Sequence, residues 1–315
     1  SFCSVPKIEP TYRDYVPTIS KMEQIKRFYG EKINLLLMDN NVLASPKFSV
    51  IIDEIKKMGF INGAKIQRAN KYEVYIRNIK EDRNIDSYII SIHRELINFY
   101  SYLKAKRNIE IAKDFLEILI KYKLYERLSI TKENLMESYT LISPIFKKYR
   151  NKGYKNRYVD FNQGTDARYV TKDLMVRMSE IPIRPLRIAF DYLGMKDQYI
   201  NAVELAAKNG LKNFSNYLLY NFTDKPSDLW ERMKINIDLC KRLDINIFSF
   251  PMKYIPLYGE EAKGRKYIGN KWNKKFIRAN QIILNVTKGI VASGDKFFNR
   301  AFGSTINENI VILHM

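Results

Sequence analysis

The sequence predicts an α/β protein, a partial (β/α) barrel of parallel strands that carries an inserted helical subdomain. Two observations predict this fold class. Apolar segments of strand length alternate with segments of helical periodicity near the start of the chain and again in its second half, which is typical of parallel βα units. Between these parts lies a long segment, residues 62–156, that shows mainly helical periodicity. A plain βα connection needs far fewer residues, so we interpret this segment as an insertion.

The first part of the barrel is assigned to residues 1–61. A helix is expected over 20–29 from a capping-box spacing at its start, and a second over 46–58 from the helical spacing of its apolar residues. Between them, the continuous apolar run 33–38 predicts a strand covered on both faces, as in a parallel sheet. This strand is followed directly by Asp39, Asn40 and Asn41.

The insertion, residues 62–156, is basic as well as helical. It holds 20 Lys and Arg against 11 Asp and Glu. Its aromatic residues, such as Phe99, Tyr100 and Tyr102, are more typical of a helical core than of base-stacking platforms. One apolar helix face is formed by Ile111, Phe115, Leu119 and Tyr122.

The remainder of the barrel is assigned to residues 157–252, where strands and helices alternate with short links. A threonine at position 171 is the expected cap of the first of these helices, and Pro226 is expected to begin the last. The predicted strands cover 158–161, 184–191, 213–221 and 245–250, and the predicted helices lie near 171–178, 197–208 and 226–243.

Residues 253–315 are expected to form a basic, mainly helical C-terminal extension. Residues 253–300 hold 11 Lys and Arg against 3 Asp and Glu, and the stretch 273–300 has an apolar face at helical spacing. The last residues, 308–315, are rich in Ile and Val and look like a strand. Because the chain stops inside this stretch, we expect that it continues beyond Met315.

The net charge of +20 is concentrated in the insertion and in the C-terminal extension. Such basic regions can attract nucleic acid or an anionic substrate. The chain is also rich in Lys, Asn, Ile and Tyr throughout, and this general bias would raise the charge without any polyanionic partner. No apolar run approaches the roughly 18 residues of a membrane span, and no signal peptide is visible. With two cysteines a disulfide framework is excluded, so we expect a soluble, cytoplasmic protein that does not contact membranes.

Polar residues follow several of the predicted strands, and the stretch 157–168 is the richest of these places. The carboxyl ends of parallel strands meet at one edge, where ligands bind in α/β folds. We therefore expect a ligand site at this edge, although a self-contained turn is the alternative at 162–166. Gly164 would allow close approach of a ligand or a positive φ. No P-loop, GxGxxG or Ser-His-Asp order is present. The candidate binding residues are Asp39, Asn40, Asn41, Asn162, Gln163, Gly164, Arg187, Asp191 and Asn221.

The N-terminal residues resemble part of the cluster-binding loop of radical S-adenosylmethionine (radical SAM) enzymes. Phe2, Cys3, Val5 and Pro6 are similar to the last arm of that loop, in which three cysteines are spaced Cys-x3-Cys-x2-Cys. The segments VDFNQGTDAR, IRPLRIAFD and NYLLYNFTDKPSDLWERM are similar to later strands and helices of uncharacterised members of this family. The resemblance covers most of the chain outside the insertion.

This resemblance implies a 4Fe-4S cluster for which Cys3 is one of three thiolate ligands, the other two preceding the given sequence. We therefore expect the chain to be a fragment that begins inside the cluster motif and is inactive alone. The family's cofactor is S-adenosylmethionine, which yields a 5′-deoxyadenosyl radical that attacks the substrate, here unknown. An electron donor such as flavodoxin or ferredoxin is implied, while the sequence leaves the presence of cobalamin open. The resemblance places Asp39 to Asn41 where the family's second strand contacts the amino acid moiety of S-adenosylmethionine. The other candidate residues would line the rest of the cofactor pocket.

Two alternatives remain open at this point. One is a radical SAM enzyme that modifies tRNA, such as a methylthiotransferase, which Val5, Pro6 and the basic flanks favour. The other is a non-catalytic basic α/β binding protein that never held a cluster. Cys240 does not replace the missing thiolates, because it shares a helix face with Leu229 and Met233, the pattern of a small core residue.

Overall fold

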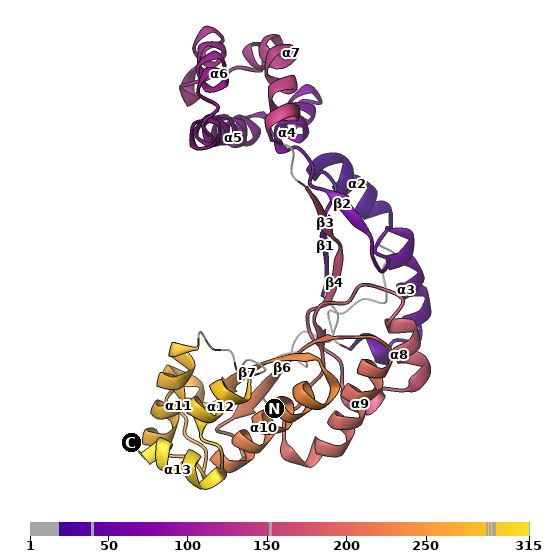
Figure 1. Ribbon diagram of the computed structural model, residues 1–315, viewed down its shortest axis with the longest axis vertical. Helices are drawn as coiled ribbons and strands as arrows, with labels where there is room; N and C mark the ends of the chain where they lie inside the picture. Colours follow the sequence, from indigo (N-terminus) through magenta and orange to yellow (C-terminus); the bar gives the residue numbers. More distant parts are fainter. Residues whose placement is uncertain are drawn as a thin grey trace. The chain divides into compact units, whose positions relative to one another are not determined.

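The computed structural model describes residues 19–38, 41–150, 153–287, 289, 291 and 294–314 (Figure 1). The chain divides into two compact units. Among the described residues, the strand unit consists of residues 34–62 and 158–314, and the helical unit consists of residues 19–33 and 63–157.

The strand unit is built on parallel pairs. Strand β1 (Asn34–Leu37) pairs with β4 (Tyr158–Phe161), and a second sheet has the order β5-β6-β7. Single parallel bridges join Val159 to Ile183 and Thr165 to Ile188, so they connect the β4 region to residues beside β5. The predicted mixed α/β class with parallel strands is confirmed, and the described strands form small sheets rather than a closed barrel. The second sheet consists of β5 (Leu186–Arg187), β6 (Asn213–Tyr220) and β7 (Asn246–Lys253).

Helices follow the strands of this unit largely where apolar periodicity predicted them. Thr171 caps α8, since its Oγ1 accepts a hydrogen bond from the Leu174 N–H at 3.3 Å. Pro226 is the first residue of α10, where its missing N–H costs nothing. The helices are α3 (Phe48–Lys57), α8 (Lys172–Met178), α9 (Lys196–Lys208), α10 (Pro226–Leu243), α11 (Lys274–Val286), α12 (Asp295–Phe302) and α13 (Ile306–His314), with short 3-10 turns η2 (Val42–Ala44), η4 (Ala167–Tyr169), η5 (Leu193–Met195) and η6 (Glu260–Arg265).

Three expectations for the strand unit were wrong. Strand β1 is not covered on both faces, because Leu36 is 55% exposed. The strand expected over 184–191 is reduced to β5, flanked by the two single bridges. The residues of 308–314 are helical, within α13. Their Ile and Val favour a strand locally, but Asn309 and Leu313, four residues apart, are buried on one helix face, so tertiary packing decides the conformation.

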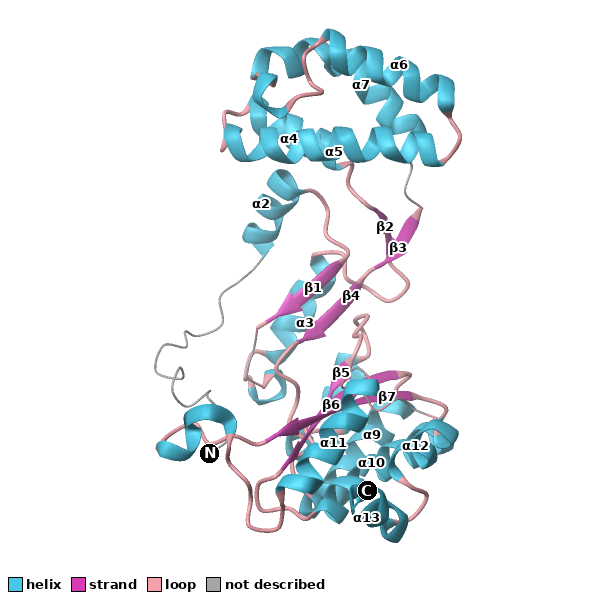
Figure 2. Ribbon diagram, turned by 90° about the vertical axis from the view of Figure 1, so that its left-hand side faces the viewer, coloured by secondary structure: helices cyan, strands magenta, loops and turns pink. Residues whose placement is uncertain are grey.

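The helical unit contains the insertion together with α2. The sequence places the 20–29 helix in the first part of the barrel. In the structure this helix, α2, contacts α4, and the Asn78 side chain donates a hydrogen bond to the Phe28 carbonyl at 2.7 Å. Two three-residue strands, too short and polar to be predicted, form an antiparallel ribbon beside the helices (Figure 2). The elements are α2 (Ile19–Tyr29), β2 (Lys65–Gln67), α4 (Lys71–Lys80), α5 (Ile85–Ala105), α6 (Ile109–Lys121), η3 (Arg127–Ser129), α7 (Lys132–Tyr149) and β3 (Tyr154–Asn156).

Stacked aromatic rings form the core of the helical unit. The Phe99 ring is fully buried, with its centroid 4.0 Å from that of Phe146 and 5.2 Å from that of Phe115. The Tyr72 ring stacks on the Phe146 ring, with the two ring centroids 4.8 Å apart. Phe99 therefore belongs to the core, as predicted, and Phe115 and Leu119 of α6 face the same core. Tyr100 is partly buried against this core, whereas the prediction is wrong for Tyr102, which is 38% exposed.

Replacing Phe99 by alanine should destabilise the helical unit by about 3–5 kcal/mol, because it leaves a large cavity among packed rings. Amide hydrogen exchange read by mass spectrometry should show faster exchange in peptides of α5, α6 and α7. The matched control is Leu128→Ala, since Leu128 is 92% exposed. Unchanged protection in Phe99→Ala would contradict this assignment of the core.

Candidate functional site

A cavity of about 570 Å³ lies at the carboxyl ends of β4, β5, β6 and β7, all within the strand unit. Its volume is in the range of small-molecule and cofactor sites. Five of the nine candidate binding residues line it together, as the parallel strand arrangement predicts: Asn162, Gln163, Gly164, Arg187 and Asp191. The other lining residues are Ile188, Ala189, Asn216, Tyr217, Leu219, Met252, Lys253, Tyr254 and Ile255.

The residues that follow β4 form a turn and also line the cavity. Gly164 has φ +88°, and its N–H donates to the Phe161 carbonyl at 3.1 Å. A Cβ at this position would lie 3.4 Å from the Arg187 Cβ, so glycine suits both the backbone angle and the close approach. The turn alternative is therefore present here, but it leaves the side chains of Asn162 and Gln163 on the cavity.

Arg187 forms a fixed wall of the cavity. Its Nε and Nη2 donate to the two oxygens of Asp160 at 2.9 and 2.8 Å, and Nη1 lies 3.3 Å from the Ser215 hydroxyl. The hydrogen-bonded Asp160 carboxylate raises the pKa of Arg187 above its usual value. The guanidinium is thus engaged by a carboxylate that the sequence analysis did not single out, although the two charges lie on neighbouring parallel strands.

Asp191 presents a carboxyl group that no hydrogen-bond donor among the described residues satisfies. Burial raises the pKa of Asp191, and nearby Asp166 adds to this rise, while the charges of Arg232 and Arg168 oppose it. Arg168 itself is paired with Asp166 at 2.6 Å. The Asp191 carboxyl is available for a donor group on a ligand.

Asn221 is not part of the cavity lining. It is fully buried, and its Nδ2 lies 3.3 Å from the Tyr254 carbonyl and 3.2 Å from the Tyr267 carbonyl. Its Oδ1 accepts a hydrogen bond from the Gly269 N–H at 2.8 Å. Asn221 therefore holds the loop that follows β7, and it places Tyr254 rather than contacting a ligand.

The residues around the end of β1 are only partly described. Asp39, Asn40 and Cys3 lie outside the described residues. Asn41 is described and lies outside the cavity lining, just before η2. Its Oδ1 is buried and has no hydrogen-bond partner among the described atoms.

The sequence analysis missed the lining residues of β6 and β7. Tyr217 and Met252 are 46% and 48% exposed and supply apolar surface. Asn216 is buried, and its amide nitrogen donates to the Tyr199 hydroxyl at 2.8 Å. Strand alternation could have indicated these residues, because side chains two apart in β6 share a face. It could not indicate which of the two faces lines a cavity, because that depends on tertiary packing.

A buried guanidinium holds the backbone at two sides of the cavity. Arg232 of α10 is fully buried, and its Nη1 donates to the Asp191 carbonyl at 2.7 Å, while its Nη2 donates to the Leu219 carbonyl at 2.6 Å. The Phe190 and Asp228 carbonyls and the Asp224 carboxylate accept from the remaining N–H groups. All five donors of the guanidinium are thereby used. Burial raises the pKa of Asp224 and lowers that of Arg232, despite their pairing.

Metal-ligand chemistry is limited among the described residues. They contain no group of three His, Cys, Asp or Glu side chains that could hold a metal ion. Cys240 is a buried core residue, as predicted, and its Sγ accepts a hydrogen bond from the Ile247 N–H at 3.2 Å. Burial raises the pKa of its thiol to about 11, so it stays protonated at neutral pH.

Comparison with known proteins places the chain in no family. Neither a scan against protein-family models nor a search of curated proteins finds a match. Across the described part of the chain, no helix has the length and apolar character required to cross a membrane.

Replacing Arg232 by methionine should lower the free energy of unfolding by about 3–5 kcal/mol, because the change leaves the buried Asp224 carboxylate without its cationic partner and several carbonyls without the guanidinium donors. Urea unfolding followed by circular dichroism measures this loss. Arg242→Met on the same helix is the control, since Arg242 is 56% exposed in its pair with Glu204 and should lose less than about 1 kcal/mol. Equal losses in the two variants would contradict the role of Arg232.

Replacing Asp191 by asparagine should stabilise the protein at neutral pH. The pKa of Asp191 is raised in the folded state, so its ionised form costs stability above that pKa, and the cost disappears as the pH falls through it. The advantage of Asp191→Asn should therefore shrink between about pH 7 and about pH 4. Urea midpoints across this range test it, with exposed Asp197→Asn as control. An advantage that grows on acidification would contradict the burial of Asp191.

Proposed function

We propose that this chain carries the cofactor-binding part of a radical SAM enzyme and that the cavity of the strand unit binds S-adenosylmethionine. The observation that carries the proposal is the meeting of polar side chains from successive parallel strand ends on one cavity of suitable volume. Such edges are where α/β folds bind ligands. The N-terminal resemblance around Cys3 supports the choice of cofactor.

The lining is suited to a ligand that is charged at one part and aromatic at another. Asn162, Gln163 and Asp191 offer amide and carboxyl groups, whereas Tyr217, Met252 and Ile255 offer apolar surface. S-adenosylmethionine combines an amino acid moiety with an adenine ring, so it matches both kinds of surface.

The amino group of the cofactor matches the Asp191 carboxyl, which lines the cavity and accepts no hydrogen bond from the described residues. The contact of Asn41 with the amino acid moiety stays a prediction, because Asn41 lies outside the cavity lining. Arg187 would shape the site rather than bind the carboxylate, because its guanidinium is engaged by Asp160.

The described residues do not include the thiolates that the proposed iron-sulfur cluster requires. Of its three thiolates, the given sequence would supply Cys3, which lies outside the described residues, and the protonated core thiol of Cys240 does not fit this role. When bound, the cluster and S-adenosylmethionine supply electron transfer and hydrogen-abstraction chemistry. The described residues would bind and orient the cofactor and restrict access of water to it.

We infer that the parallel strands β1, β4, β5, β6 and β7 belong to an open, partial barrel. The two single bridges beside β5 support this arrangement, since they continue the parallel order from β4 to the second sheet. The substrate, the electron donor and the cytoplasmic location stay predictions.

The first test is the full reading frame. The proposal expects a Cys-x3-Cys-x2 sequence directly before Cys3, and the full-length protein should bind S-adenosylmethionine after anaerobic reconstitution. Asn162→Ala and Asp191→Ala should each weaken binding about tenfold or more, as expected for a lost hydrogen bond to a charged group. Equilibrium dialysis measures the affinity.

Asn201→Ala is the matched control, because Asn201 is exposed on α9 and outside the lining. An upstream sequence without the two cysteines would remove the enzyme proposal. Equal affinities in Asn162→Ala, Asp191→Ala and the control would remove the cavity as the cofactor site.

A further inference from the structure

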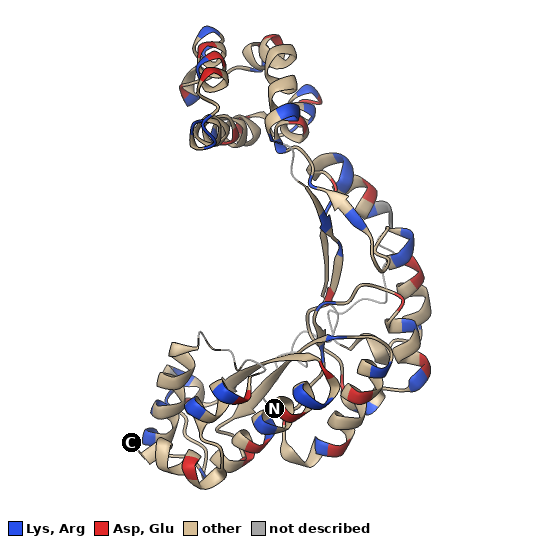
Figure 3. Ribbon diagram, in the orientation of Figure 1, with Lys and Arg blue, Asp and Glu red and all other residues tan. Residues whose placement is uncertain are grey.

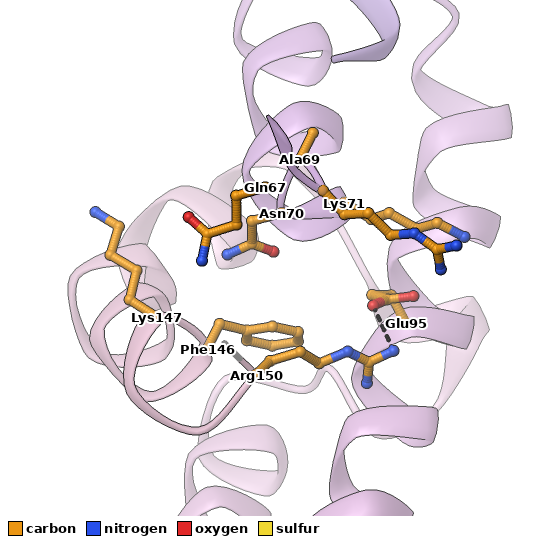
Figure 4. A pocket seen from close by; sticks show the side chains of 9 residues that line it. Gln67, Ala69, Asn70, Lys71, Glu95, Phe146, Lys147 and Arg150 are labelled. Atoms are coloured by element: carbon orange, nitrogen blue, oxygen red, sulfur yellow. Dashed lines mark ion pairs between the residues drawn. The ribbon is translucent and has the colours of Figure 1, made fainter. Parts of the chain in front are cut away.

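The helical unit has a cavity of its own, of about 330 Å³, which the proposed function does not use (Figure 4). Its lining comes from two segments far apart in sequence, the chain entering α4 and the end of α7, together with one residue of α5. Four lining residues are cationic and one is anionic. The lining residues are Gln67, Arg68, Ala69, Asn70, Lys71, Glu95, Phe146, Lys147 and Arg150.

The single acidic group in this lining is already neutralised. Glu95 is 7% exposed and pairs with Arg150 at 2.9 Å. The Arg150 guanidinium also lies 5.7 Å from the Phe99 ring centroid and 5.9 Å from that of Tyr102. Glu95 and the two rings therefore fix Arg150 at the cavity wall, as Figure 4 shows for the ion pair.

The other three cations lack acidic partners. Among the described residues, no carboxylate lies within ion-pair distance of Arg68, Lys71 or Lys147. Lys71 is also the first residue of α4, an end of the helix dipole that disfavours a cation and favours an anion. Three uncompensated positive charges around a polar cavity make it a site for a negatively charged group.

Positive charge continues along both segments that form the cavity. Residues 64–72 and 147–157 contain nine Lys and Arg and no Asp or Glu, and Lys65, Lys148 and Lys155 are exposed in addition to the lining cations. Arg157 does not add to this available charge, because it is buried and pairs with Glu31 at 3.3 Å. Figure 3 draws the described Lys and Arg in blue. The strands β2 and β3 hold these segments side by side. Exposed cations spread along two adjoining segments match a chain of phosphates better than a single small anion.

An exposed aromatic ring stands beside the cavity. In the antiparallel register Tyr154 faces Gln67, so both side chains project from the same face of the ribbon. Gln67 lines the cavity, and Tyr154 is 71% exposed. A solvent-exposed ring next to cations is the arrangement on which unpaired bases stack.

We propose that this cavity and the β2–β3 ribbon bind single-stranded RNA, with backbone phosphates held by Arg68, Lys71 and Lys147 and a base stacked on Tyr154. This interaction goes beyond the proposed cofactor site and does not depend on it, because it lies wholly within the helical unit.

Fluorescence anisotropy with a short labelled single-stranded RNA tests the proposal on the full chain. The triple variant Arg68→Gln, Lys71→Gln, Lys147→Gln should bind about tenfold or more weakly, and its plot of log K against log salt should be shallower by about 2, the value for three lost phosphate contacts. These three side chains are exposed, so the variant should fold.

The matched control is Lys104→Gln, Lys113→Gln, Lys121→Gln, which removes the same charge from exposed positions of α5 and α6. It should keep its affinity within about threefold. An equal loss in both triple variants would show a net-charge effect and overturn the site.

Further measurements test whether the ligand is single-stranded RNA. Tyr154→Ala should weaken RNA binding about fivefold or more, whereas Tyr125→Ala, at another exposed ring of the unit, should not. Competition by polyglutamate as effective as that by RNA would overturn the nucleic-acid assignment. Binding of inorganic phosphate at the three cations without RNA binding would overturn it in favour of a small phosphate ligand.

Discussion

The strand unit depends on one buried interaction, the contact of the Arg232 guanidinium with backbone carbonyls in β6 and in the segment after β5. Arg232 has no exposed surface, and it joins the carbonyls of Asp191 and Leu219 through hydrogen bonds of 2.7 and 2.6 Å. A charge this deeply buried is tolerated only when its donors are satisfied. Since both carbonyls belong to residues of the cavity lining, the same interaction that satisfies the charge also fixes the site.

The two cavities differ in how their charges are balanced. In the strand-unit cavity, Arg187 is matched by Asp160, and the Asp191 carboxyl accepts no hydrogen bond from the described residues. In the helical unit, Glu95 is matched by Arg150, and the groups left without acidic partners are cations. The first site therefore calls for a ligand with an N–H donor, and the second for a ligand with negative charge.

The sequence predicted the position of β4 at 158–161, where strand-forming residues end in a polar turn, and that of α10 at 226–243, where apolar periodicity follows an N-terminal proline. It predicted the convergence of Asn162, Gln163, Gly164, Arg187 and Asp191, because parallel strands end at one edge. It failed at α13, where Ile and Val favour a strand but packing of Leu313 favours a helix. The contacts of Arg232 with the Phe190 and Asp191 carbonyls and the pairing of Arg187 with Asp160 join residues distant in sequence, and a single sequence carries no local signal for such pairs.

The central claim is that the strand-end cavity binds S-adenosylmethionine, and photoaffinity labelling with an azido-adenosyl analogue of the cofactor tests it most directly. Peptide mapping of the reconstituted full-length protein should find the label within 162–164, 187–191, 216–219 or 252–255, and excess S-adenosylmethionine should suppress it. Label found only elsewhere in the chain, or label that the cofactor does not displace, would contradict the account.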